Sequence, residues 1–245
     1  FRSEHWLHLF SEGISILTFI VGAAVLVGWA FDIEFLKSVF PGLVTMKANT
    51  ALCFVLAGVA LWFSQPGRVN TRSFRVISGA CFFFVAFVGL RTLSEYLFGW
   101  NLGIDQLLFK EPAGAVHTIN LGRMAPDTAV CFVLFAVGSW IVYGMSKNRR
   151  LILTAGLTAS LILIVFALSA VLSYSFLGFV LLGWGNLTPM ALHTSLIFLA
   201  LGTMIILETL RGGSAPRISQ FSKNLLVSGV LVIILTIVFS LYVQS

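Results

Sequence analysis

The sequence is poor in charged residues. Asp, Glu, Lys and Arg together make up only 10% of its 245 residues, and 58% of the residues are hydrophobic. In an ordinary soluble domain about a quarter of the residues are charged. This shortage excludes the class of soluble globular domains and predicts a protein embedded in a membrane.

Cysteine is also scarce, and its number is odd. The three cysteines, Cys53, Cys81 and Cys131, all fall inside long hydrophobic runs. Disulfide frameworks need paired cysteines in an oxidising environment. The cysteine content therefore argues against a fold held together by disulfides.

The signatures of catalysis are missing as well. The sequence has no Gly-rich phosphate-binding loop, no His-x-x-x-His pair on one helix and no nucleophile set beside a base. We therefore expect no enzyme in these residues and place any catalytic output domain outside them. The first residue is Phe and no cleavable signal precedes the first hydrophobic run, so we also expect a piece of a longer protein.

Long hydrophobic runs are abundant. A run of about 18 or more apolar residues marks a spanning helix, because about 20 residues cover a hydrocarbon core of about 30 Å. About seven runs qualify, at 11–31, 46–64, 74–98, 125–145, 151–172, 190–209 and 223–243. The stretch Leu172 to Gly183 is too short to span and predicts an interfacial or re-entrant segment. The sequence thus predicts an all-α fold, a polytopic membrane helix bundle with residues 1–245 in a single membrane domain.

Basic residues are distributed unevenly between the connections. Most of the 15 Lys and Arg residues fall in the N-terminus and the even-numbered connections, namely Arg2, Arg68, Arg72, Arg75, Lys147, Arg149, Arg150, Arg211, Arg217 and Lys223. The other side carries Lys37, Lys47, Arg91, Lys110 and Arg123. By the positive-inside rule the N-terminus is cytoplasmic. The net charge of +6 therefore reflects topology in a bilayer, and we expect no nucleic-acid partner.

A short phrase is repeated where hydrophobic runs begin. The copies are MKANT at Met46–Thr50, MAPDT at Met124–Thr128 and MALHT at Met190–Thr194. The run before each copy ends in an aromatic residue, Trp29, Tyr96 or Tyr174, as is typical of a bilayer surface. We expect three pseudo-repeated helical hairpins, at about 11–64, 74–145 and 151–210, followed by a seventh helix at about 223–243.

The polar residue of each copy is predicted to lie inside the bundle. Thr188 and Pro189 form a strong helix start, which places His193 about one turn inside its helix. Asn49 and Asp127 occupy the equivalent depth, too deep for simple capping residues. Around a pseudo-threefold axis, the helix faces that carry these residues would converge on one outward-facing pocket.

The candidate ligand-binding residues come from these faces and from the outer end of the third helix. They are Met46, Asn49, Thr50, Arg91, Glu95, Met124, Asp127, Thr128, Met190, His193 and Thr194. Ionisable residues within spans usually face a bundle interior or an aqueous cavity, which favours a pocket. The alternative is structural, since repeated polar residues also join helices through hydrogen bonds, and Arg91 can pair with Glu95 four residues on.

Several ligand classes fit such a pocket. A metal ion could use His193 and Asp127 as donors. A quinone could hydrogen-bond to either side chain and pack against the many Phe residues. A haem is disfavoured, because only His193 lies clearly inside a span and a bis-His site needs two. The cofactor therefore stays unknown, with a metal ion and a quinone both open.

The longest outer connection, Gly99 to Arg123, contains the stretch LGIDQLLF. Its Leu102, Ile104, Leu107 and Leu108 predict a short amphipathic helix in the membrane interface. The same segment could equally form a lid over a site.

Four longer stretches carry a family resemblance. They are GLVTMKANTALCFVLAGVALW, LSEYLFGWNLGIDQLLF, GRMAPDTAVCFVLFAVG and MALHTSLIFLALG. In this order they resemble the multi-pass membrane sensor regions, similar in kind to MASE domains, that precede PAS, histidine kinase or diguanylate cyclase modules in bacterial signalling proteins. The resemblance covers most of residues 14–210. It implies a sensory role in two-component or related signal transduction and a homodimer formed through the signalling output, but it implies no particular ligand.

We therefore expect a sensory or receptor domain of the bacterial inner membrane. It would contact the lipid bilayer and bind a small ligand, an ion or a lipophilic redox carrier in a pocket on the extracytoplasmic side. A transporter or channel is the alternative, because internal repeats also mark transporters, although the cytoplasmic stretches VLAGVALWF and FAVGSWIVY are nearly all apolar. An accessory membrane subunit of a larger complex is a third possibility.

Overall fold

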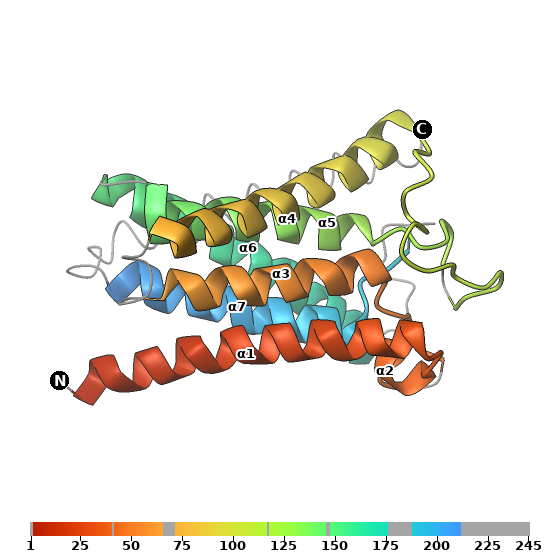
Figure 1. Cartoon of the computed structure of the whole chain (residues 1–245), viewed down its shortest axis with the longest axis horizontal. Helices are drawn as coiled ribbons and strands as arrows, with labels where there is room; N and C mark the ends of the chain where they lie inside the picture. The colour runs from red at the N-terminus through yellow and green to blue at the C-terminus, as the bar shows by residue number, and fades with distance from the viewer. Residues whose placement is uncertain are drawn as a thin grey trace.

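The computed structural model describes residues 2–40, 42–65, 72–116, 118–145, 148–175 and 188–211. Within these ranges the chain forms helices joined by turns and loops, and no strand (Figure 1). The helices are α1 (Arg2–Ala30), α2 (Glu34–Ser38), α3 (Ala48–Ser64), α4 (Arg72–Phe98), α5 (Pro126–Trp140), the π-helix η1 (Ile141–Met145), α6 (Arg149–Ser175) and α7 (Leu192–Arg211). The described chain is therefore all-helical, as predicted.

Helices long and apolar enough to cross a membrane make up most of the bundle. The described residues contain 5 such candidate spans, Trp6–Ala30, Arg72–Phe98, Pro126–Gly144, Arg149–Tyr174 and Leu192–Arg211. With 17 residues, α3 is apolar but shorter, about 26 Å long at 1.5 Å per residue. These helices are consistent with the predicted helical membrane bundle. The predicted helix at 223–243, and the stretch Leu172 to Gly183 beyond the end of α6, lie outside the described residues.

The long helices pack in adjacent pairs. Helix α1 packs along α3, α4 along α5, and α6 along α7. Further contacts between α3 and α4, between α5 and α6, and between α7 and α1 join each pair to the next and close the bundle. Helices that are neighbours in the chain thus also lie side by side in space, with α3, α5 and α7 meeting at the centre.

Glycines allow the helices of a pair to approach closely. A Cβ atom added to Gly22 of α1 would lie 2.6 Å from the carbonyl oxygen of Ala51 in α3, and one added to Gly58 of α3 would lie 2.8 Å from that of Ser15. In the next pair, a Cβ atom on Gly89 would lie 2.8 Å from the Ala129 carbonyl oxygen. Small residues at such contacts are the usual means by which membrane helices pack, because lipid tails provide little hydrophobic drive for association.

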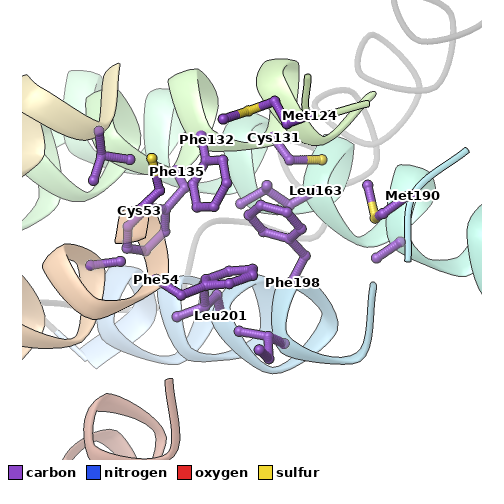
Figure 2. Packing of buried hydrophobic residues seen from close by; sticks show 14 of the residues in the cluster. Cys53, Phe54, Met124, Cys131, Phe132, Phe135, Leu163, Met190, Phe198 and Leu201 are labelled. Carbon is purple, nitrogen blue, oxygen red and sulfur yellow. The ribbon is translucent and has the colours of Figure 1, made fainter. Parts of the chain in front are cut away.

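Three phenylalanines form the centre of the core. Phe54 of α3, Phe132 of α5 and Phe198 of α7 are fully buried, and their rings point toward one another (Figure 2). The ring centroids are 4.9 Å, 5.0 Å and 5.2 Å apart, which is the range of favourable aromatic pairs. Each Phe lies four residues after the Thr of a repeated phrase, so both residues share one face of their helix.

The outward faces of α1 and α4 are apolar. Leu17 and Ile20 of α1 and Phe83, Phe87 and Leu90 of α4 are exposed large hydrophobic side chains. In water such a surface would drive association, whereas in a bilayer it contacts lipid tails. These faces are therefore compatible with contact to a lipid bilayer.

Candidate ligand site at the outer end of the bundle

The candidate site lies where α3, α5 and α7 begin, at the end that the charge distribution predicts to be extracytoplasmic; we call it the outer end. Here each aromatic residue that precedes a repeated phrase donates a hydrogen bond to the Met carbonyl of that phrase. The bonds join Trp29 Nε1 to Met46 O at 2.9 Å, Tyr96 OH to Met124 O at 3.2 Å and Tyr174 OH to Met190 O at 2.8 Å. Sequence reasoning assigned these aromatic residues only to the bilayer surface, although their recurrence before each phrase was a signal for a shared contact.

The Met side chains of the phrases are packing residues. Met46, Met124 and Met190 are at most 1% exposed and belong to the hydrophobic core. Their carbonyl groups precede the helices, and buried carbonyls need a hydrogen-bond partner. The aromatic donors provide it and thereby fix how each segment enters its helix.

Three threonines surround a small hollow at the outer end. Thr50, Thr128 and Thr194, the last residues of the three phrases, line it together with Thr45, Thr188 and Lys47. Its volume is about 10 Å³, room for about one water molecule or a comparably small ion. Because each Thr shares a face with a central Phe, we call this space the axial hollow. The structure thus brings together four predicted site residues, these three threonines and Met46, which also lines the hollow.

The predicted depth of Asn49, Asp127 and His193 was wrong. Helices α3, α5 and α7 each begin only one residue before these positions, so all three side chains belong to the first turn. In the third copy Thr188 does not start the helix, because its Oγ1 instead accepts a hydrogen bond from the backbone N–H of Ile119 at 3.3 Å. Asn49, Asp127 and His193 are buried but are not among the residues that line the axial hollow.

Asn49 and Asp127 accept hydrogen bonds from backbone N–H groups in the first turns of their helices. The Oδ1 atom of each accepts a hydrogen bond from the backbone N–H of the following Thr at 2.7 Å, a donor that has no partner within the helix. Asp127 also accepts a hydrogen bond from the backbone of Met190, which ties α5 to the start of α7. Within the described residues, Asn49 Nδ2 and both ring nitrogens of His193 are buried without a hydrogen-bond partner. Asp127 is therefore a structural group, whereas His193 keeps unused polar atoms.

The donor set for a metal ion is incomplete in the part of the chain that the structure describes. No group of three or more His, Cys, Asp or Glu side chains lies close enough there to hold one. His193 and Asp127, the predicted metal donors, therefore have no third donor of these types among the described residues.

A buried ion pair joins the start of α3 to the connection between α4 and α5. Lys47 Nζ pairs with Glu111 Oε1, and the two side chains are only 3% and 1% exposed. Lys47 Nζ also bonds to Thr118 Oγ1 at 2.7 Å, and Glu111 Oε2 accepts a hydrogen bond from the backbone N–H of Gly122 at 2.7 Å. Because Lys47 lines the axial hollow, the pair links the hollow to this outer connection.

A second charged network holds the same connection against α4. Arg91 Nη2 bonds to Glu95 Oε2 and, at 2.6 Å, to Asp105 Oδ1. Arg123 Nε lies 2.7 Å from Asp105 Oδ2, and Glu95 Oε1 accepts a hydrogen bond from the backbone N–H of Leu102 at 3.1 Å. The predicted pairing of Arg91 with Glu95 is confirmed, and the Arg91 guanidinium engages two carboxylates of the protein itself.

The stretch LGIDQLLF forms turns, and the predicted amphipathic helix is absent from it. Gly103 adopts a φ of 68°, which a right-handed helix does not allow, and Asp105 is held by Arg91 and Arg123. Leu107 is 74% exposed, and Leu102, Ile104 and Leu108 are exposed as well. These apolar side chains are thus exposed on a non-helical segment.

A larger pocket opens beside the axial hollow. Its volume is about 270 Å³, close to the range of small-molecule sites, which begins at about 300 Å³. Trp29, Glu34, Lys37, Ser38, Thr45 and Glu111 line it. We call it the outer pocket; Thr45 lines both it and the axial hollow. Sequence reasoning missed this pocket, because it treated Lys37 only as a topology marker and no short motif links α2 to the distant Glu111.

Lys37 is the basic group of the outer pocket. Its Nζ bonds to Asp32 Oδ1 at 2.6 Å and lies 5.1 Å from the centre of the Trp29 ring, a cation–π distance. The hydrogen bond and charge of Lys37 lower the pKa of Asp32. The pocket thus offers an ammonium group, carboxylates, hydroxyls and an indole ring, which suit a small polar molecule with both donors and acceptors.

No protein-family model, curated protein or solved structure matches this chain. Its function is therefore argued from the chemistry of the site.

Proposed function

We propose that the chain is a membrane-integral sensory domain of a bacterial signalling protein, in the inner membrane with its N-terminus in the cytoplasm. Its ligand is a small polar molecule or ion that enters the outer pocket from the extracytoplasmic side. The bundle in this proposal consists of three pseudo-repeated hairpins and a seventh helix at 223–243. The three packed helix pairs and their matching aromatic–Met hydrogen bonds support the repeat.

The observation that carries the proposal is the position of Glu111. Glu111 is one of the residues that line the outer pocket, and its buried carboxylate pairs with Lys47, which lines the axial hollow at the start of α3. A ligand that binds Glu111 competes with Lys47 for this carboxylate. A buried Lys47 ammonium group that loses its partner costs about 3–5 kcal/mol. The ligand-bound protein therefore favours a packing in which Lys47 and α3 have moved. The ligand then binds one packing more tightly than the other, as a sensor requires.

The core below the axial hollow supports a sensor over a transporter or channel. Phe54, Phe132 and Phe198 are fully buried and fill the centre of the bundle one helical turn inward from the Thr residues. A polar path along this axis would have to displace all three rings. A signal carried by small shifts between packed helices leaves them in place.

Thermal unfolding of the purified protein in lipid nanodiscs tests the proposal. The probes are amino acids, carboxylates, sugars, inorganic phosphate, halide salts and a short-chain ubiquinone. We expect at least one polar probe to raise the Tm of the wild type and to have little effect on Glu111→Gln. The matched control is Lys110→Gln, which removes an exposed charge at the neighbouring position and should keep the response.

Two results would overturn the proposal. One is an equal rise of Tm in wild type and Glu111→Gln with every active probe, which would place binding elsewhere. The other is uptake of the active probe into proteoliposomes, which would identify a transporter.

A further inference from the structure

The opposite end of the bundle contains a second cavity of about 300 Å³, which we call the inner cavity. It lies between the end of α3, the start of α4 and the junction of α5 with η1. Ser64, Arg75, Ser78, Phe82, Trp140 and Tyr143 line it. Among the described residues, Arg72, Arg75, Arg149, Arg150 and Arg211 lie at the helix ends on this side, so the charge distribution predicts that it faces the cytoplasm.

Two glycines keep this cavity open. Gly79 of α4 and Gly144 of η1 belong to its lining, and a Cβ atom added to either would meet nothing within 4 Å. The π-helix itself widens the helical turn that carries Tyr143 and Gly144, and π-helical segments are frequent at functional sites. At these two positions the lining is therefore backbone with open space around it.

The mouth of the inner cavity carries the positive charge of Arg75. Arg75 is exposed, and within the described residues its guanidinium forms no ion pair. It lies in the first turn of α4, where the helix dipole adds further positive potential. A guanidinium in this position is suited to bind a phosphate group through paired N–H donors.

The polarity of the cavity changes with depth. Arg75 stands at the mouth, whereas Phe82 lies two turns further along α4 and is only 2% exposed. Trp140 and Tyr143 stand beside them, and such rings are typical of the interface between headgroups and tails. Val76 and Phe83, on the adjacent face of α4, are 62% and 61% exposed and continue the apolar surface toward the bilayer. The order of charge, aromatic ring and apolar floor matches the order of groups in a phospholipid.

We propose that the inner cavity binds the phosphate headgroup of an anionic phospholipid from the adjoining leaflet, with Arg75 on the phosphate and the start of an acyl chain over Gly79 and Phe82. Basic pockets between membrane helices on the cytoplasmic side commonly hold such lipids. The lipid bridges α3, α4 and η1, so it stabilises the packing of two neighbouring helix pairs. This site is independent of the ligand at the outer end.

A lipid titration of the whole protein in nanodiscs tests this proposal. Phosphatidylglycerol is increased in a phosphatidylcholine background, and binding is followed by the rise in Tm and by lipid retained in native mass spectrometry. We expect Arg75→Gln to weaken the apparent affinity for phosphatidylglycerol about tenfold, as for the loss of one charge-assisted contact. The matched control is Arg72→Gln, which removes an exposed charge one turn away that does not line the cavity. We expect it to stay within about twofold of wild type.

A second variant tests the contribution of the cavity to lipid binding separately from that of the Arg75 charge. Gly79→Leu keeps Arg75 but fills the space over the floor, and we expect it also to lose the retained lipid. Equal weakening in Arg72→Gln and Arg75→Gln would overturn the proposal, since it would reflect general surface charge. The same Tm rise with inorganic phosphate in pure phosphatidylcholine nanodiscs would overturn it too, because the site would then bind a free anion.

Discussion

Lys47 Nζ and Glu111 Oε1 form a buried ion pair although 64 residues separate them along the chain. The pair fastens the connection between α4 and α5 onto the start of α3. It also separates two spaces of the outer end, with Glu111 in the wall of the outer pocket and Lys47 in the wall of the axial hollow. The stability of the outer end and its proposed response to a ligand therefore depend on the same contact.

Removing one partner of this pair should destabilise the protein strongly. Lys47→Met leaves a buried carboxylate and Glu111→Gln leaves a buried ammonium group, so we expect each to lower the free energy of unfolding by about 3–5 kcal/mol. The double variant should lose less than the sum, because neither charge remains. Denaturant unfolding of the wild type, the two single variants and the double variant, analysed as a double-mutant cycle, measures the interaction energy of the pair. Additive losses would show that the two side chains do not interact.

The aromatic donors to the Met carbonyls should each contribute measurably to stability. Tyr96→Phe and Tyr174→Phe keep the ring and remove only the hydroxyl that donates to Met124 or Met190. We expect a loss of about 0.5–1.5 kcal/mol for each variant, measured by thermal unfolding. Two variants as stable as the wild type would argue that the hydrogen bonds have no role at the outer end.

Two alanine substitutions in the same helix should have opposite effects. Gly22→Ala places a methyl group 2.6 Å from the Ala51 carbonyl oxygen, so α1 must move away from α3, at a cost of about 1–3 kcal/mol. Gly13→Ala meets nothing within 4 Å and improves helix propensity, so we expect a gain of up to about 1 kcal/mol. The free energies of unfolding of Gly22→Ala, Gly13→Ala and the wild type, measured under the same conditions, test both expectations. Equal effects would contradict the close approach of α1 and α3.

The Asp32–Lys37 bond predicts a pH dependence of stability at acid pH. Lys37 lowers the pKa of Asp32 below its ordinary value of 3.8. A carboxyl whose pKa is lower in the folded state stabilises the protein above 3.8 and loses that contribution as the pH falls through the lowered pKa. Asp32→Asn should remove this part of the pH dependence while tolerating the φ of 57° at this position. Identical pH profiles of Tm for variant and wild type would refute the contribution.

The membrane fold was largely predictable, because it depends on local properties. Each span is a run of apolar residues long enough to cross a bilayer, and this property does not depend on distant contacts. Helix starts were less predictable. Lys47 and Ala125 precede α3 and α5 without any side-chain cap, so no capping residue marked the boundary. Thr188 resembled a cap but bonds to the outer connection instead.

The candidate site was predictable only in part, because it combines local and distant contacts. The repeated phrases correctly indicated Thr50, Thr128 and Thr194 as a group, since residues in equivalent helical positions meet when the helices meet. The outer pocket depends on Glu111 reaching residues that precede α3, and no local pattern encodes such a contact. Asn49 and Asp127 were predicted to bind a ligand, whereas in the structure each accepts a hydrogen bond from the backbone N–H of the next residue in its own helix.

The most direct test of the central claim is cysteine labelling at the rim of the outer pocket. Ala113 lines this pocket and is exposed, and Ser73, exposed near the start of α4, is the control at the opposite end. In a background without Cys53, Cys81 and Cys131, a membrane-impermeant maleimide should label Ala113→Cys in intact bacteria with a permeabilised outer membrane. Ser73→Cys should react only after the inner membrane is opened. A solute that raises Tm through Glu111 should slow the labelling of Ala113→Cys. Labelling of Ala113→Cys only after the inner membrane is opened, or labelling that such a solute leaves unchanged, would contradict an outward-facing ligand pocket.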